Sequence, residues 1–203
     1  MTGTRPAATL SGGVVLLERA LGYALGQLHA VTSADLARPT PCRGWDVRGL
    51  LRHMDDSLIA LQEALDLAWV DVEASGEAEP AYGPADSAIS LVGRLRGHAS
   101  RLLGALAGAS EGLIWVGGFP VPKSIVTSAG AVDVAVHGWD VARACGRPQP
   151  IPERLAAEML EISPLLVTCA DRPALFAAPV PVPPLASASD RLVAYLGRDP
   201  AAA

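Results

Sequence analysis

Aromatic residues and cysteines are scarce in this chain of 203 residues. Aromatic residues make up 4% of the sequence while half of it is hydrophobic, so the core must be built mainly from alanine, leucine and valine. The three cysteines, Cys42, Cys145 and Cys169, are odd in number and widely spaced. This pattern excludes a disulfide framework and a zinc site built from cysteines.

The chain also lacks an excess of positive charge and a long uninterrupted apolar run. The formal net charge is −5, which argues against a nucleic-acid binder because phosphate backbones are bound by basic patches. No apolar run reaches about 18 residues without a charge, so we expect no segment to span a membrane. Residues 1–11 are too short and too broken for a signal peptide. By elimination, we expect a reduced, cytoplasmic location.

Apolar residues repeat with helical spacing over most of the chain. Gly146 is expected to end the helix before it, and Asp46 and either Asp86 or Ser87 are expected to cap the helices that follow them. The strand signal is limited to residues 113–116. This pattern predicts an all-α bundle of one domain with a short C-terminal helical and Pro-rich extension. The expected segments are long helices at 11–31, 47–70, 87–107 and 124–145, shorter helices at 152–168 and 190–196, an acidic loop at 71–86 and an extended Pro-rich segment at 171–184.

The most informative motif lies in the apolar segment 125–145. Asp133 and His137 are four residues apart, so they fall on one helix face, and Asp140 falls on nearly the same face. An ionised carboxylate on a helix with no polar side needs a partner. The three polar groups can partner one another, a distant charge or a metal ion.

The metal interpretation needs a third ligand from another helix, and His53 is the best candidate. Its helical neighbours on one side are small, which leaves room beside the imidazole. Two imidazoles and one carboxylate on facing helices suit a divalent transition metal with open positions for water or substrate. Zinc is the expected ion, and nickel or iron would accept the same donors. The small neighbours are Gly49, Ser57, Ala60 and Ala64.

Each of these residues also has a simpler interpretation. An acid–His pair at this spacing is usually a salt bridge, and a lone histidine such as His53 is more often a satisfied core or surface group. The other two histidines, His29 and His98, have no functional case. Asp140 has two open roles: it orients His137 as a hydrogen-bond acceptor, or it pairs with a nearby arginine such as Arg143.

Two stretches of the chain resemble one protein family. Pro39 to Arg48, followed by Leu50 to His53, resembles the entry to the second helix of the mycothiol-dependent maleylpyruvate isomerase N-terminal domain. Val136 to Pro148 resembles the matching stretch of its fourth helix. The tail, at 179–183 and 190–200, is similar to a largely uncharacterised branch of the same family. The resemblance covers most of the chain, and the first two motifs are fairly specific when taken together.

The family belongs to the DinB/YfiT-like metal-binding bundles. The resemblance therefore implies a four-helix bundle in an up-down-down-up arrangement. It also implies a metal held by a histidine of the second helix and an acid-x-x-x-His pair of the fourth, which are His53, Asp133 and His137 here. We expect residues 1–150 to form this bundle and residues 151–203 a helical extension packed on it, so that the two parts make one domain.

The chain departs from the family pattern in two places. The family has Glu where this chain has Asp133, and Asp is one methylene shorter. Either the helices lie closer together or the ion is held more loosely, in which case Asp140 would help Asp133 to coordinate it. The isomerase also has a further C-terminal domain that helps to enclose its substrate, whereas only a short extension follows the fourth helix here. Isomerisation of maleylpyruvate itself is therefore not expected.

The resemblance favours a thiol-dependent enzyme, a transferase or isomerase that acts on a small electrophilic substrate with mycothiol as the thiol. A zinc ion at His53, Asp133 and His137 would lower the pKa of a bound thiol. Asp140 is then the catalytic candidate, as an orienter or a proton acceptor. Cys42 precedes a helix N-terminus, which can depress a thiol pKa, but we expect it to be structural and buried.

The alternative hypothesis is a non-catalytic helical bundle. Such a bundle would hold a metal for stability or sensing, or would hold none and bind a partner protein. The loop 71–86 and the Pro-rich tail would be the contact surfaces. The apolar faces of the bundle also leave a homodimer open.

Overall fold

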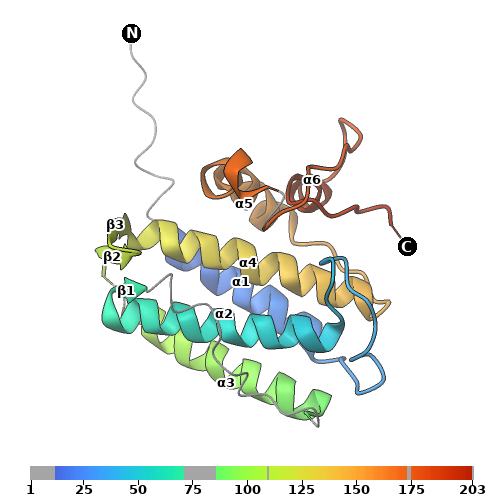
Figure 1. The fold of residues 1–203 in the computed structure, drawn as a ribbon, viewed down its shortest axis with the longest axis horizontal. Coiled ribbons are helices and arrows are strands. Elements are labelled where there is room, and N and C mark those ends of the chain that lie inside the picture. The colour runs from blue at the N-terminus through green and yellow to red at the C-terminus, as the bar shows by residue number, and fades with distance from the viewer. Residues whose placement is uncertain (1–11, 71–85, 109, 173–174, 203) are drawn as a thin grey trace.

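Helices make up most of the residues that the computed structural model describes, which are 12–70, 86–108, 110–172 and 175–202 (Figure 1). The predicted helices are confirmed, with ends that differ by a few residues. The expected first residue Ser11 and most of the loop 71–86 lie outside the described residues. The helices are α1 (Gly13–Leu28), α2 (Val47–Leu67), α3 (Ala88–Ala107), α4 (Lys123–Ala144), α5 (Glu153–Leu166) and α6 (Ala188–Tyr195).

The predicted caps form at three helix ends. The Asp46 side chain accepts a hydrogen bond from the Gly49 backbone N–H at 2.8 Å and so caps α2. Ser87 caps α3 in the same way. Gly146 has a φ of 69°, a conformation that favours glycine, and its position just past α4 ends that helix. The capping residues and the terminating glycine predicted from the sequence therefore mark the starts of α2 and α3 and the end of α4.

The central helix of the bundle is α4. Fifteen of its 22 residues are buried, because α1 and α2 flank it and the C-terminal extension covers a further side (Figure 1). The first residue of α1, Gly13, faces Ser124 at the start of α4, and Gly138 faces Ala24 toward the ends of both helices. The two helices therefore run in the same direction. A helix buried on most sides has no solvent-exposed face on which a carboxylate could be hydrated, so the acidic residues of α4 need partners.

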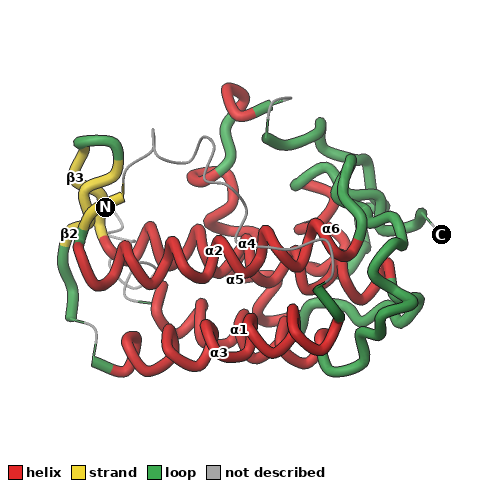
Figure 2. Tube along the Cα trace, turned by 60° about the horizontal axis from the view of Figure 1, so that its bottom comes forward, coloured by secondary structure: helices red, strands yellow, loops and turns green. Residues whose placement is uncertain are grey.

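A small three-stranded sheet closes one end of the bundle (Figure 2). The strand expected at 113–116 is confirmed as β2 (Leu113–Val116), which pairs antiparallel with β3 (Phe119–Pro122). The second helix was predicted to reach residue 70, and this is wrong by three residues. Ala68 has a φ of 52°, which ends α2 at Leu67, and β1 (Trp69–Val70) then pairs parallel with β2.

The C-terminal extension packs on the bundle along α4. Residues from α5 and α6 belong to the same hydrophobic cluster as those of the four long helices, and Arg19 of α1 pairs with Glu158 of α5 at 2.7 Å. The expectation of an all-α bundle with a small helical extension is confirmed. Among the described residues, no helix combines the length and the apolar character that crossing a bilayer requires.

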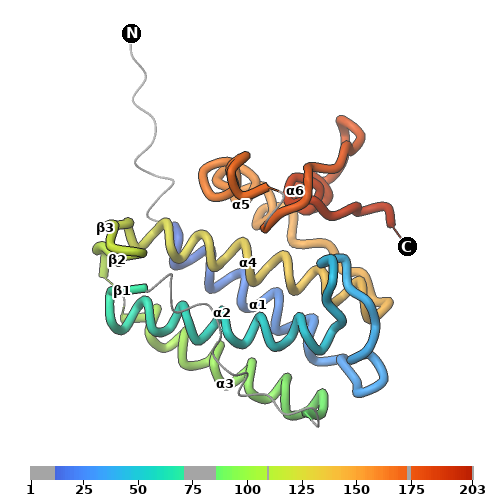
Figure 3. Tube along the Cα trace, in the orientation of Figure 1, coloured from blue at the N-terminus to red at the C-terminus, as the bar shows by residue number. Residues whose placement is uncertain are grey.

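The connection between α1 and α2 lies beside the end of α4 (Figure 3). Arg38 of this connection donates a hydrogen bond to the Ala144 carbonyl at 3.2 Å, and Arg147 reaches back to the Ala30 carbonyl. Thr40 and Trp45 close the connection through a backbone hydrogen bond of 3.0 Å. These contacts carry Cys42 and Trp45 toward the polar face of α4.

Candidate metal centre

The structure brings His53, Asp133 and His137 together at the interface of α2 and α4. The Asp133 Oδ1 lies 3.6 Å from the His53 Nε2 and 3.3 Å from the His137 Nε2. One donor atom from each of the three residues lies within 4.8 Å of the other two. The two imidazole rings meet edge to face, with centroids 4.9 Å apart. The residues predicted to form one cluster therefore do so.

A close approach of the two helices makes this cluster geometrically feasible. Gly130 lies one turn before Asp133, and a Cβ built on it would come within 2.6 Å of the Leu61 side chain on α2. A larger residue here would require either the Leu61 side chain or the helix spacing to shift. The short Asp133 side chain therefore coincides with a tight helix pair, which matches the closer-helix explanation for an aspartate in place of a glutamate.

A buried ion pair anchors the far side of the His137 ring. The His137 Nδ1 lies 3.0 Å from the Asp140 Oδ2, and Asp140 is fully buried. Two nitrogens of the Arg198 guanidinium donate hydrogen bonds to the same carboxylate, Nη2 to Oδ2 at 3.0 Å and Nε to Oδ1 at 3.4 Å. Such a bidentate pair fixes both the orientation and the charge of a carboxylate. Asp140 therefore holds the imidazole so that Nε2 faces Asp133.

The arginine that pairs with Asp140 is not the one suggested by sequence proximity. Arg143 lies over the Trp139 ring, 5.3 Å from its centroid, and Arg198 takes the place beside Asp140. Gly197 has a φ of 84°, and this left-handed residue turns the chain after α6 so that Arg198 points back into the bundle. The contact spans 58 residues of sequence. Arg198 lies in the tail segment 190–200 that resembles the family branch, but no sequence pattern indicated its role.

Trp45 and Cys42 border the cluster from the connection between α1 and α2. The Trp45 ring centroid is 4.5 Å from that of His53 and 6.2 Å from that of His137, so the indole covers one side of both imidazoles. The donor atoms of Cys42, His137 and Asp140 also lie within 4.8 Å of one another. A cation among these three would lie beside the fixed charge of Arg198, so this second group is a poor metal site.

The electrostatics of the cluster favour a charged, hydrogen-bonded state in the absence of an ion. Burial lowers the pKa of His137, but Asp133 and Asp140 outweigh burial and raise it to about 9. Burial raises the pKa of Asp133, but the two histidines outweigh it and hold that pKa well below its usual range. Cys42 is half-buried rather than buried as expected, but burial raises the pKa of its thiol, which agrees with a structural cysteine rather than an activated one.

The other two histidines form contacts away from the cluster, as expected for residues to which the sequence assigns no function. His98 of α3 lies 2.6 Å from the buried Asp55 of α2, on the opposite side of α2 from α4. His29 is exposed and its Nδ1 contacts the Gly26 carbonyl within its own helical turn. Neither belongs to a cluster of metal donors among the described residues.

The cluster fits a divalent ion by its donors and by one buried atom without a partner. Two imidazole nitrogens and a carboxylate oxygen are the donor set of many zinc sites that keep an open position. The Asp133 Oδ2 is buried, and no hydrogen-bond partner for it exists among the described residues. Buried polar atoms are rarely left unpaired, and the Asp133 Oδ1 lies near both imidazole nitrogens, where a cation could bind.

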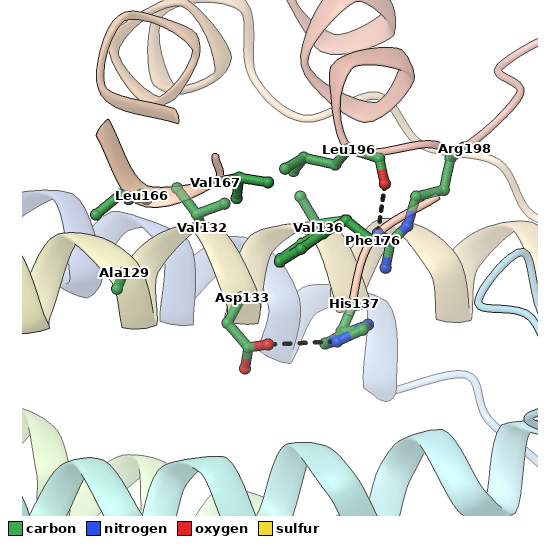
Figure 4. Close-up of a pocket in the computed structure, with 10 residues that line it drawn as sticks. All are labelled: Ala129, Val132, Asp133, Val136, His137, Leu166, Val167, Phe176, Leu196 and Arg198. Atoms are coloured by element: carbon green, nitrogen blue, oxygen red, sulfur yellow. Dashed lines mark hydrogen bonds and ion pairs between the residues drawn. The ribbon is translucent and has the colours of Figure 1, made fainter. Parts of the chain in front are cut away.

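An apolar pocket of about 110 Å³ adjoins the cluster, between α4 and the C-terminal extension (Figure 4). Its polar lining consists of Asp133, His137 and Arg198. The other lining side chains, which are apolar, come from α4, from the end of α5, and from the chain that follows. His53 retains 36% of its side-chain exposure, so the cluster also opens to solvent on the α2 side.

The fold and this cluster define a class, the DinB-like all-α bundles with a His/Asp/His group on their second and fourth helices. Residues 17–142 match the family described as mycothiol maleylpyruvate isomerase N-terminal domain, and the chain belongs to that family. The matched segment contains the three clustered residues as well as Asp140. Arg198 and the four apolar lining residues from the C-terminal extension lie beyond it.

The chain is also similar to uncharacterised proteins of Mycobacterium tuberculosis, from strain CDC 1551 / Oshkosh and from strain ATCC 25618 / H37Rv. Each is 29% identical over 173 residues, which cover 84% of this chain and 89% of the relative. The similarity extends into the C-terminal extension, since 173 residues are more than residues 1–150 can supply. No solved structure matches the chain significantly.

Proposed function

We propose that the chain binds a divalent transition metal, zinc first, and uses it to activate a small thiol that reacts with an electrophilic substrate. The observation that carries this proposal is the convergence of His53, Asp133 and His137, with donor atoms at 3.3 and 3.6 Å around a carboxylate that has one unpaired buried oxygen. Nickel or iron would use the same donors.

The residues have separate roles in this proposal. The His53 Nε2, the His137 Nε2 and the Asp133 carboxylate are the ligands. Asp140 accepts a hydrogen bond from the His137 Nδ1, which leaves Nε2 free for the ion. Asp140 is fully buried and both of its oxygens are engaged, so it acts as a positioning residue rather than as a proton acceptor for substrate.

Membership of the family supports a mycothiol-type thiol as the second reactant. A bound zinc ion would stabilise the thiolate form of that thiol and so supply a nucleophile at neutral pH. The exposed side of His53 offers the entry for a thiol that carries a large polar group. The apolar pocket on the other side of Asp133 and His137 offers the place for the electrophile. Apolar side chains of the C-terminal extension line that pocket.

Metal analysis tests the ligand assignment. Protein purified without a His tag and dialysed against zinc should retain about one equivalent, as a three-ligand site with good orientation does. Asp133→Ala should lose that zinc, whereas Asp140→Ala should retain it with an affinity lowered about 10- to 100-fold. His29→Ala is the matched control, because His29 is exposed and contacts only its own helical turn. Zinc retained by Asp133→Ala as well as by the control would refute the site.

Catalysis is tested separately from metal binding. Zinc-loaded protein with a small thiol should consume a generic electrophile faster than His53→Ala protein treated in the same way. Equal rates, with zinc still bound to the unaltered protein, would remove the enzyme proposal. The remaining explanation would then be the non-catalytic metal-binding bundle.

A further inference from the structure

The pocket beside the cluster is mainly apolar, and none of the described residues that line it offers a free cation that could hold an anion. Arg198 is its cationic lining residue, and its guanidinium is already bound on two atoms by Asp140 and on a third by the Leu196 carbonyl at 3.0 Å. Asp133 and His137 form the remaining polar border. Figure 4 shows Val132 and Val136 on α4, below the extension that contributes Val167.

The charges of the loaded site also cancel. With a divalent ion and a thiolate in place, the ion is matched by the thiolate and Asp133, and Arg198 is matched by Asp140. A carboxylate entering the pocket would lose its hydration without gaining an unpaired cation. Burying an ionised carboxylate without a partner is strongly unfavourable. The pocket therefore discriminates against anionic substrates.

The volume of the pocket sets an upper limit on what it can enclose. An engineered apolar cavity of about 150 Å³ in another protein accommodates benzene. A pocket of about 110 Å³ therefore encloses a group somewhat smaller than a benzene ring. Ala129 lies exposed on α4 and lines the same pocket, which places it at the rim.

We propose that this pocket selects the uncharged, compact end of an apolar electrophile, such as a short-chain enone, and rejects dicarboxylates. The inference rests on the proposed function for its chemistry and on the pocket alone for its selectivity. With an enone, the thiol sulfur forms a bond to the β-carbon, the carbon–carbon π bond breaks, and the thiol proton ends on the α-carbon. The overall reaction is an addition of the thiol across the carbon–carbon double bond, which needs no oxidant and releases no leaving group.

Ligand binding to the metal-free protein tests the selectivity without any activity. Butan-2-one, an inert ketone of the proposed size, should shift the NMR signals of the Val132, Val136 and Val167 methyl groups, and maleate should not. Ala129→Phe should weaken the binding of butan-2-one about tenfold by filling the rim. The matched control is Ala107→Phe at the exposed end of α3, far from the pocket, which should leave binding unchanged. Maleate binding as tight as that of butan-2-one, or no methyl shift with either ligand, would overturn the proposal.

Turnover separates this inference from the proposed function. Zinc-loaded protein with N-acetylcysteine should accelerate the consumption of methyl vinyl ketone over its uncatalysed rate. The acceleration factor for trans-4-oxopent-2-enoate, a charged enone, should be smaller. Acceleration of the charged enone by an equal or larger factor would overturn the selectivity. If neither enone is accelerated while butan-2-one still binds as described, the thiol-transfer function fails and the pocket selectivity is supported by the binding result.

Discussion

His137 uses both nitrogens of its ring, and each faces a different carboxylate. Its Nε2 lies 3.3 Å from Asp133, and its Nδ1 lies 3.0 Å from Asp140, which is itself held by Arg198. In the metal-free protein this arrangement keeps both nitrogens protonated at neutral pH, because its pKa is raised to about 9. A metal ion must therefore displace the Nε2 proton, while the Nδ1 proton stays on its bond to Asp140.

The first prediction concerns this proton. Between pH 6.5, the ordinary value for histidine, and about pH 9, zinc affinity should rise with pH, because metal and proton compete for the His137 Nε2. At neutral pH, binding should release about one proton, measured by titration calorimetry in two buffers of different ionisation enthalpy. His137→Gln should bind zinc weakly and should release fewer protons. Zinc affinity independent of pH across this window would contradict the assignment.

His137 also makes the stability of the metal-free protein depend on pH, and this stability should fall as pH rises while the zinc affinity increases. Its folded pKa is higher than its unfolded value, so its charged pairs stabilise the fold fully below pH 6.5 and lose that contribution as pH rises toward 9. Metal-free protein should therefore become less stable over the range in which metal affinity increases. Denaturant unfolding at several pH values, with and without zinc, checks both halves of the expectation.

At the scale of elements, the site depends on how closely α2 and α4 approach. The sequence was sufficient to predict both helices and the shared face of Asp133 and His137, because a spacing of four residues fixes that face whatever the tertiary structure. It was not sufficient to predict β1, because two residues carry no strand pattern and the turn before them uses a left-handed alanine, Ala68. Gly130 shows where a small residue matters for the packing of α4 against α2.

The second prediction tests that approach. Gly130→Val should destabilise the fold by about 1–3 kcal/mol and weaken zinc binding, because its side chain would overlap Leu61 and a shift of α2 that relieves the overlap would move His53 away from Asp133. Adding Leu61→Ala should restore much of the zinc affinity by clearing that space. Gly104→Val on α3 is the matched control, since a Cβ there meets nothing within 4 Å. The measurements are urea unfolding and zinc titration, and full zinc affinity in Gly130→Val would show that helix spacing does not govern the site.

At the scale of the whole molecule, a chain of contacts joins the C-terminal extension to the cluster. It runs from Arg198 through Asp140 to His137, and so links the segment after α6 with the middle of α4. No local pattern could predict it, because the partner of Asp140 is 58 residues away and depends on the path of the extension. Trp45 is similar: its motif was visible in the sequence, but the tilted contact of its ring with His53 depends on how the connection before α2 folds.

The third prediction separates the structural part of this chain of contacts from its effect on the site. Arg198→Met alone leaves a buried carboxylate with one partner fewer and should cost about 3–5 kcal/mol of stability. The double variant Asp140→Leu, Arg198→Met replaces the buried pair with apolar side chains of similar size, so its stability should recover most of that loss. Zinc affinity should not recover with it, because His137 then has no acceptor to fix its ring. Urea unfolding and zinc titration on the unaltered protein, the single variant and the double variant supply the comparison. If zinc affinity returned together with stability, the Asp140 carboxylate would serve the fold of the extension and not the orientation of His137.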